Sequence, residues 1–137
     1  LVVEDDPLLR LGACAVLREA GYGTLEAADA EEAIDILEHR EYIGVVFSDI
    51  QMPGSLDGVE LAHRVRRRWP PIEVLLTSGR HTPSADELPE RVRYPPKPFA
   101  APELLAIVGQ LAAVHEPIPT RASAGPAVLR APTSRPA

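Results

Sequence analysis

Strand-like apolar runs alternate with helical patterns about five times along this chain of 137 residues. The strands are expected at 1–3, 24–27, 43–48, 72–76 and 92–94, and the helices at 7–20, 30–40, 58–68 and 102–115. Such alternation implies parallel strands joined by right-handed crossovers. We therefore expect an α/β fold of the flavodoxin-like type, with a doubly wound five-stranded parallel sheet and helices on both faces.

The two ends of this pattern carry further information. The first helix is expected to begin at Pro7 with Asp6 as its cap. The residues expected on its core side are Leu9, Ala13, Val16, Leu17 and Ala20. Near the other end, Pro83 and Pro89 allow at most a short helix between them. Because prolines 95 and 96 remove two backbone donors, the last strand is expected at an edge of the sheet.

Composition excludes several classes of protein. Three of the 14 basic residues lie after Glu116, so residues 1–116 carry 11 basic and 20 acidic side chains. This acidic balance argues against nucleic-acid binding by the domain. The single cysteine, Cys14, excludes an internal disulfide and a thiolate zinc site, and we expect it to be a small core residue.

The chain also lacks targeting signals. It contains no apolar run of about 18 residues and no signal-peptide pattern, so we expect a cytoplasmic protein without a membrane span. Because the sequence opens within a strand and without Met, a few residues are expected to precede Leu1. We expect a domain over 1–116 and a flexible tail rich in Pro and Ala over 117–137.

Polar residues stand where the apolar runs end. They are Glu4 and Asp5 after the first strand, Asp49 after the third, Thr77 after the fourth, and Lys97 within Pro96-Lys97-Pro98-Phe99. In an open parallel sheet, ligands bind beyond the carboxyl ends of the strands. Acids from two neighbouring strands repel one another there, and a bound cation removes that cost. Oxygen ligands suit Mg²⁺, and the chain has no His or Cys cluster that would favour zinc or iron.

These residue types together indicate phosphoryl-transfer chemistry. The Asp49 carboxylate can attack phosphorus and form a mixed anhydride. A cation and the Lys97 ammonium would offset charge on the phosphoryl oxygens, and the Thr77 hydroxyl would donate to one of them. Lys97 is the only lysine in the chain, and its flanking prolines restrict the backbone.

The combination strongly resembles the receiver domain of two-component response regulators, the CheY-like family. The matching segments are 1–7 (LVVEDDP), 47–54 (FSDIQMPG), 57–61 (DGVEL), 76–79 (LTSG) and 96–99 (PKPF), in the family's order and near its spacing. They extend over residues 1 to about 115. Two departures stand out: the loop 53–58 is one residue longer than the commonest form, and the stretch between Thr77 and Lys97 is short.

The resemblance implies specific roles. Asp49 would accept a phosphoryl group from a histidine of a sensor kinase or phosphotransfer protein. Mg²⁺ would be held by Asp5, Asp49 and the main-chain carbonyl of Gln51, with Glu4 acting through water. Thr77 and Lys97 would contact the phosphoryl group, and Thr77 with Tyr94 would form the switch that changes a surface read by a downstream protein. Histidine donors would dock near the first helix, where Leu8 is a candidate anchor.

Three functions remain open at this point. The first is a phosphoacceptor signalling domain, either single or cut from a larger regulator or hybrid kinase, whose only catalysis is its own phosphorylation and dephosphorylation. The second is an aspartyl-phosphate phosphohydrolase, although that class usually carries a second Asp at the position of Gln51. The third is a receiver-like module that binds partners without phosphorylation. No Gly-x-Gly-x-x-Gly follows the first strand, which disfavours dinucleotide binding.

Overall fold

The computed structural model describes residues 1–79, 83–95 and 100–113, and the structural statements below concern these residues. Five parallel strands form one sheet in the order β2-β1-β3-β4-β5. The strands are β1 (Val2–Val3), β2 (Glu26–Ala27), β3 (Val45–Asp49), β4 (Glu73–Thr77) and β5 (Val92–Arg93). The helices are α1 (Pro7–Glu19), α2 (Ala30–His39), α3 (Gly58–Arg68) and α4 (Ala101–Ala112). The predicted doubly wound α/β fold is confirmed.

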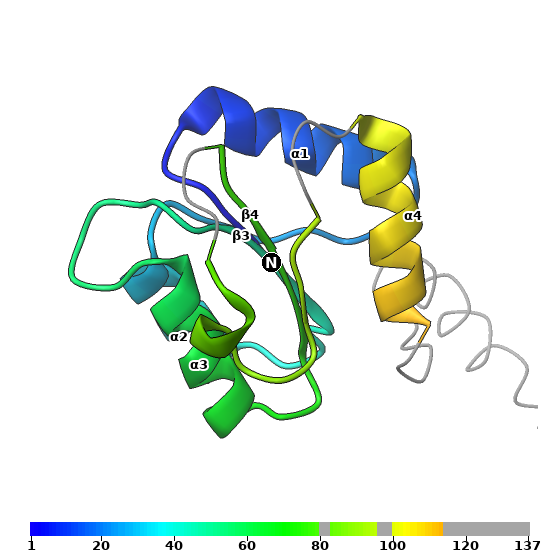
Figure 1. The fold of residues 1–137 in the computed structure, drawn as a ribbon. Helices are drawn as coiled ribbons and strands as arrows, with labels where there is room; N and C mark the ends of the chain where they lie inside the picture. Colours follow the sequence, from blue (N-terminus) through cyan, green and yellow to red (C-terminus); the bar gives the residue numbers. More distant parts are fainter. Residues whose placement is uncertain (80–82, 96–99, 114–137) are drawn as a thin grey trace, which may run out of the picture.

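The helices cover both faces of the sheet (Figure 1). On one face, α2 and α3 pack a cluster that includes Ala33, Leu37, Leu61 and Val65 against the strands. On the other face, Cys14 and Leu17 of α1 pack with Leu104, Val108 and Leu111 of α4. Burial of these two apolar layers is the main force that holds the sheet between its helices.

The register of the sheet aligns the ends of its central strands. Val3 of β1 lies beside Ser48 of β3, and Asp49 of β3 lies beside Thr77 of β4. Because all strands are parallel, the residues that follow β1, β3 and β4 emerge at one edge. This edge is where the sequence places the acids and the threonine hydroxyl.

The core side of α1 is predicted correctly at positions 13, 16 and 17 and wrongly at its two ends. Leu9 is 60% exposed and Ala20 is exposed, whereas Cys14 and Leu17 are buried. The inward stripe runs through positions 10, 14 and 17, and Arg10 occupies its first place because its guanidinium finds oxygen partners there. The prediction for Cys14 is confirmed, since its side chain is fully buried.

The segment before β5 contains one short helical turn, the 3-10 helix η1 (Ala85–Glu87), as the two prolines predicted. Side chains of α3 hold this segment by its backbone: His63 Nε2 lies 2.8 Å from the Glu87 carbonyl oxygen, and Arg66 Nε donates to the Glu90 carbonyl at 3.0 Å. β5 is an edge strand, as predicted. Hydrogen bonds from α3 therefore hold in place the described residues between η1 and β5.

Parts of the prediction fall outside the described residues. The proposed tail, 117–137, and the segment that contains Lys97 are among these, so the expected domain boundary stays a prediction. Within the described part of the chain, no helix is both long and apolar enough to cross a membrane.

Candidate active site

Three carboxylates meet at the carboxyl edge of the sheet. Glu4 and Asp5 lie in the turn after β1, and Asp49 is the last residue of β3. One carboxylate oxygen from each lies within 4.8 Å of the other two. Glu4 and Asp49 are half-buried, and Asp5 is exposed. Sequence positions 4, 5 and 49 therefore converge, as expected from the parallel register.

Backbone contacts hold the turn that carries Glu4 and Asp5. The Glu4 N–H donates to the Ala27 carbonyl at 3.0 Å, which continues the β1–β2 pairing by one residue. The Glu4 carboxylate accepts from the Asp6 N–H at 3.0 Å. Asp6 in turn accepts from the Leu8 N–H at 2.9 Å and so caps α1, as predicted. The acidic turn and the start of α1 therefore form one unit.

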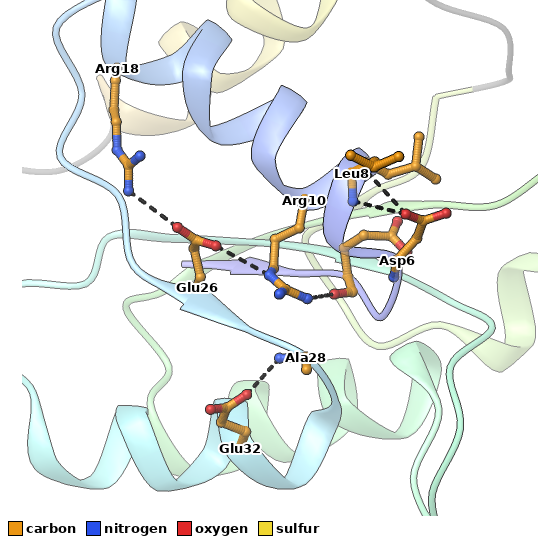
Figure 2. Close-up of polar contacts among 9 residues, drawn as sticks. Asp6, Leu8, Arg10, Arg18, Glu26, Ala28 and Glu32 are labelled. Atoms are coloured by element: carbon orange, nitrogen blue, oxygen red, sulfur yellow. Dashed lines mark hydrogen bonds and ion pairs between the residues drawn. The ribbon is translucent and has the colours of Figure 1, made fainter.

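Arg10 ties this unit to the sheet (Figure 2). Its Nη1 donates to the Glu4 carbonyl at 2.7 Å, and its Nε donates to Glu26 Oε1 at 3.2 Å. Glu26 also accepts from Arg18 at 3.3 Å. Sequence analysis did not identify Arg10 as part of the site. The local sequence offered only a weak signal, an arginine in the first turn of a helix that directly follows an acidic turn.

The surroundings of Glu4 disfavour the ionised form of its carboxyl group. Burial raises the pKa of Glu4 to about 6, and the nearby Asp49 and Asp5 carboxylates add to that rise. The donor set consists of oxygens alone, which fits a hard divalent cation such as Mg²⁺. A cation among these carboxylates would remove the repulsion and favour the ionised form of Glu4.

Thr77 places a hydroxyl beside the acids. Its side chain is 5% exposed, and its Oγ1 is buried without a hydrogen-bond partner among the described residues. Thr77, Asp49 and Glu4 line one pocket, of about 170 Å³, together with apolar side chains that include Leu9 and Leu104. A buried hydroxyl without an acceptor costs folding free energy, and an oxygen of a ligand in this pocket would remove that cost.

A close backbone approach fixes the loop after Asp49. The Ile50 N–H donates to the Thr77 carbonyl at 2.9 Å, and the Gly58 N–H donates to the Ile50 carbonyl at 2.7 Å. A Cβ atom on Gly58 would lie 2.2 Å from the Asp49 carbonyl oxygen. Only glycine fits here. Sequence analysis treated Gly58 as an ordinary helix start, although glycine in a first helical turn is itself a weak signal of close approach.

The remaining predicted site residues are distributed as follows. Gln51 is exposed on the loop after β3, and Tyr94 is half-buried against the α2–α3 side of the core. Lys97 lies outside the described residues. The described residues thus bring together Glu4, Asp5, Asp49 and Thr77 at one edge.

Together, the open five-stranded parallel sheet, with three carboxylates and a buried threonine hydroxyl at its carboxyl edge, defines an α/β domain of the flavodoxin-like class. A family model for the response regulator receiver domain matches residues 1–108. The sensor kinase CckA of Brucella abortus is 33% identical over 115 residues, which make up 81% of this chain and 12% of the kinase. The chain thus spans a small part of that relative.

Solved structures agree with this match. The receiver domain of a hybrid histidine kinase CckA is 35% identical, with a TM-score of 0.66 over 80% of this chain and 94% of that one. The response regulator TrrA of Thermotoga maritima, solved with Mg²⁺ and BeF, is 30% identical, with a TM-score of 0.68 over 80% and 95% of the two chains. The chain belongs to the response regulator receiver domain family, whose members are signalling domains of two-component systems.

Proposed function

We propose that Asp49 is the phosphoacceptor of this receiver and takes its phosphoryl group from the phosphohistidine of a sensor kinase or phosphotransfer protein. The observation that carries this proposal is the meeting of three carboxylates beside the hydroxyl of Thr77, which has no partner in the part of the chain that the structure describes. Similarity to the CckA receiver supports a histidine-kinase donor. The setting would be the cytoplasm, where such kinases present their phosphohistidine.

The proposed reaction is an in-line displacement. A carboxylate oxygen of Asp49 attacks phosphorus, the P–N bond to the donor imidazole breaks, and an acyl phosphate remains on Asp49. Water later attacks the same phosphorus and releases inorganic phosphate. The protein contributes position and electrostatics more than bond-making groups.

Four groups would hold Mg²⁺: the carboxylates of Asp5 and Asp49, the Gln51 carbonyl, and Glu4 through water. When bound, the cation supplies positive charge that offsets the charge of the phosphoryl oxygens. The structure of the Thermotoga relative in complex with Mg²⁺ and BeF supports Mg²⁺ as the cation. The Lys97 ammonium would supply a second positive charge, a role that rests on the Pro-Lys-Pro-Phe motif.

The signal would pass through Thr77 and Tyr94 to a downstream protein. The Thr77 hydroxyl would donate to a phosphoryl oxygen and so gain the acceptor that it lacks. The added charge would shift an equilibrium between two conformations of the surface near Tyr94 and residues 83–91. The phosphohistidine donor would approach over α1, where Leu8 is 78% exposed and Leu11 54% exposed.

The test of this function is labelling with a small phosphodonor. The full chain is incubated with phosphoramidate and Mg²⁺, and intact mass is followed. We expect the addition of one phosphoryl group, its removal by hydroxylamine, and no addition when EDTA removes the metal. Rapid and repeated release of phosphate would favour the phosphohydrolase, and no adduct under any condition would favour the inert binding module.

Replacing Thr77 with valine is expected to raise the stability of the protein and to lower its rate of phosphoryl uptake. Valine keeps the shape and removes the buried hydroxyl, so the unfolding free energy of the unphosphorylated protein should rise by about 1 kcal/mol. The rate of uptake from phosphoramidate should fall about tenfold, as for loss of one hydrogen bond to a charged group. Urea unfolding and intact-mass kinetics measure the two effects. Lower stability with unchanged uptake would contradict the proposed role of Thr77.

A further inference from the structure

Glu31 of α2 contacts the loop that follows Asp49, although the two are far apart in the sequence. Glu31 Oε2 accepts from the Ser55 hydroxyl at 2.5 Å and from the Ser55 N–H at 3.2 Å. These contacts hold the pKa of Glu31 below its ordinary value, chiefly through the Ser55 hydroxyl, so the carboxylate is ionised at neutral pH. The first turn of α2 therefore binds the tip of this loop, residues 53–55, through Ser55.

The loop after Asp49 is buried at both ends and exposed at its tip. Ile50 and Leu56 are buried and fix the two ends of the loop, and Met52 is half-buried. Pro53, Gly54 and Ser55 are exposed between these anchors. Gly54 has a φ of +107°, and a Cβ atom there would lie 2.9 Å from Glu31 Oε1. A glycine tip of this kind is conformationally free unless a side chain binds it.

The loop matters because it joins the candidate phosphoacceptor to a candidate metal ligand. Gln51, whose carbonyl is proposed to bind Mg²⁺, lies two residues after Asp49 and four before Ser55. A loop with an exposed glycine at its tip can place that carbonyl in more than one way, and a contact from outside the loop reduces this freedom.

We propose that Glu31, through Ser55, is a positioning residue of the metal site: it holds the loop so that the Gln51 carbonyl faces the acids Asp5 and Asp49. This inference rests on the function proposed above. Glu31 acts as a hydrogen-bond acceptor for the loop and does not touch the metal or the phosphoryl group. Through this contact, α2, which also packs against the core, helps to order the metal site at the edge of the sheet.

The experiment compares Mg²⁺ dissociation constants of full-length variants by titration calorimetry. Glu31→Ala should weaken Mg²⁺ binding about tenfold, the lower end of the range for residues that orient a metal ligand. Glu31→Gln should stay within about twofold of the wild type, because an amide oxygen still accepts from Ser55. Ser55→Ala should weaken binding less than Glu31→Ala, and the double variant should be no worse than Glu31→Ala alone.

Glu32→Ala is the matched control. Glu32 lies on the same helix, carries the same charge and also accepts one exposed hydrogen bond, but from the Ala28 N–H at 2.6 Å and not from the loop after Asp49. Its loss should leave Mg²⁺ affinity unchanged while lowering the melting temperature about as much as Glu31→Ala does. A common fall in stability therefore cannot produce the expected difference in affinity.

Three outcomes would overturn the inference. Unchanged Mg²⁺ affinity of Glu31→Ala removes the positioning role while the function of the wild type stands. Equal losses in Glu31→Gln and Glu31→Ala would assign the effect to charge instead of loop position. If the wild type neither binds Mg²⁺ nor takes up phosphate, the proposed function fails first and this inference fails with it.

Discussion

Replacing Asp49 with asparagine is expected to abolish phosphoryl uptake from phosphoramidate, with a loss of at least about a hundredfold in rate, at the scale of removing a catalytic nucleophile. An amide oxygen is a poor nucleophile, and the change also removes one of the three charges that would attract the cation. The fold should survive because the side chain keeps its size. Intact mass and phosphate release after incubation with Mg²⁺ measure the effect.

The same substitution should relieve the repulsion among the acids. Burial is the largest cause of the raised pKa of Glu4 and Asp49 adds to it, so a neutral residue at position 49 should move that pKa part of the way back toward the ordinary value for glutamate. The melting temperature of the metal-free variant should therefore equal or exceed that of the wild type. This second readout separates loss of the nucleophile from loss of the fold.

Asp35→Asn is the matched control for this prediction. Asp35 is exposed on α2 and pairs with His39 of the same helix, away from the sheet edge. Its phosphoryl uptake should equal that of the wild type. If Asp49→Asn still takes up a hydroxylamine-labile phosphate, or if the label of the wild type maps to Asp5, the assignment of the phosphoacceptor is wrong.

Replacing Gly58 with alanine is expected to lower the unfolding free energy by about 3 kcal/mol, at the upper end of the range for overpacking. The new Cβ would lie 2.2 Å from the Asp49 carbonyl oxygen and 2.7 Å from the Ile50 Cα. Both are backbone atoms, so relief of the clash requires α3 or the end of β3 to move. Movement of β3 displaces Asp49, so phosphoryl uptake by the folded fraction should fall as well.

Urea unfolding followed by the fluorescence of Trp69, the single tryptophan, measures this loss. Gly12→Ala is the control, because Gly12 is exposed within α1 and a Cβ there would meet no atom within 4 Å. Alanine favours a helix over glycine by about 1 kcal/mol, so the control should be stabilised. Equal stability of Gly58→Ala and the wild type would mean that the loop after Asp49 can move away from the new Cβ at little cost in free energy.

Several features of the site could be predicted from local sequence. The acids, Thr77 and the ends of the strands were identified because each follows an apolar run, and parallel alternation brings such ends to one edge. The cap Asp6 was predicted because Asp before a helical pattern satisfies free backbone donors. The short η1 turn followed from two prolines that bracket it.

Other features depend on contacts between distant segments. Leu9 and Arg10 are adjacent, and helical spacing alone favoured Leu9 as the buried residue. The acceptors for the Arg10 guanidinium come from β2 and from the turn after β1, so its inward position was not visible in the local pattern. The same holds for Glu31, whose partner Ser55 lies 24 residues away.

The order of apolar and polar residues along this chain was enough to determine the parallel sheet, the edge that bears the acids and the kind of chemistry those acids support, because strand and helix periods are local properties. Tertiary structure alone decided which face of α1 is buried, why position 58 admits only glycine, and how α2 holds the loop after Asp49. These depend on the packing of segments far apart in the sequence, where atoms within a few ångströms of one another decide what fits.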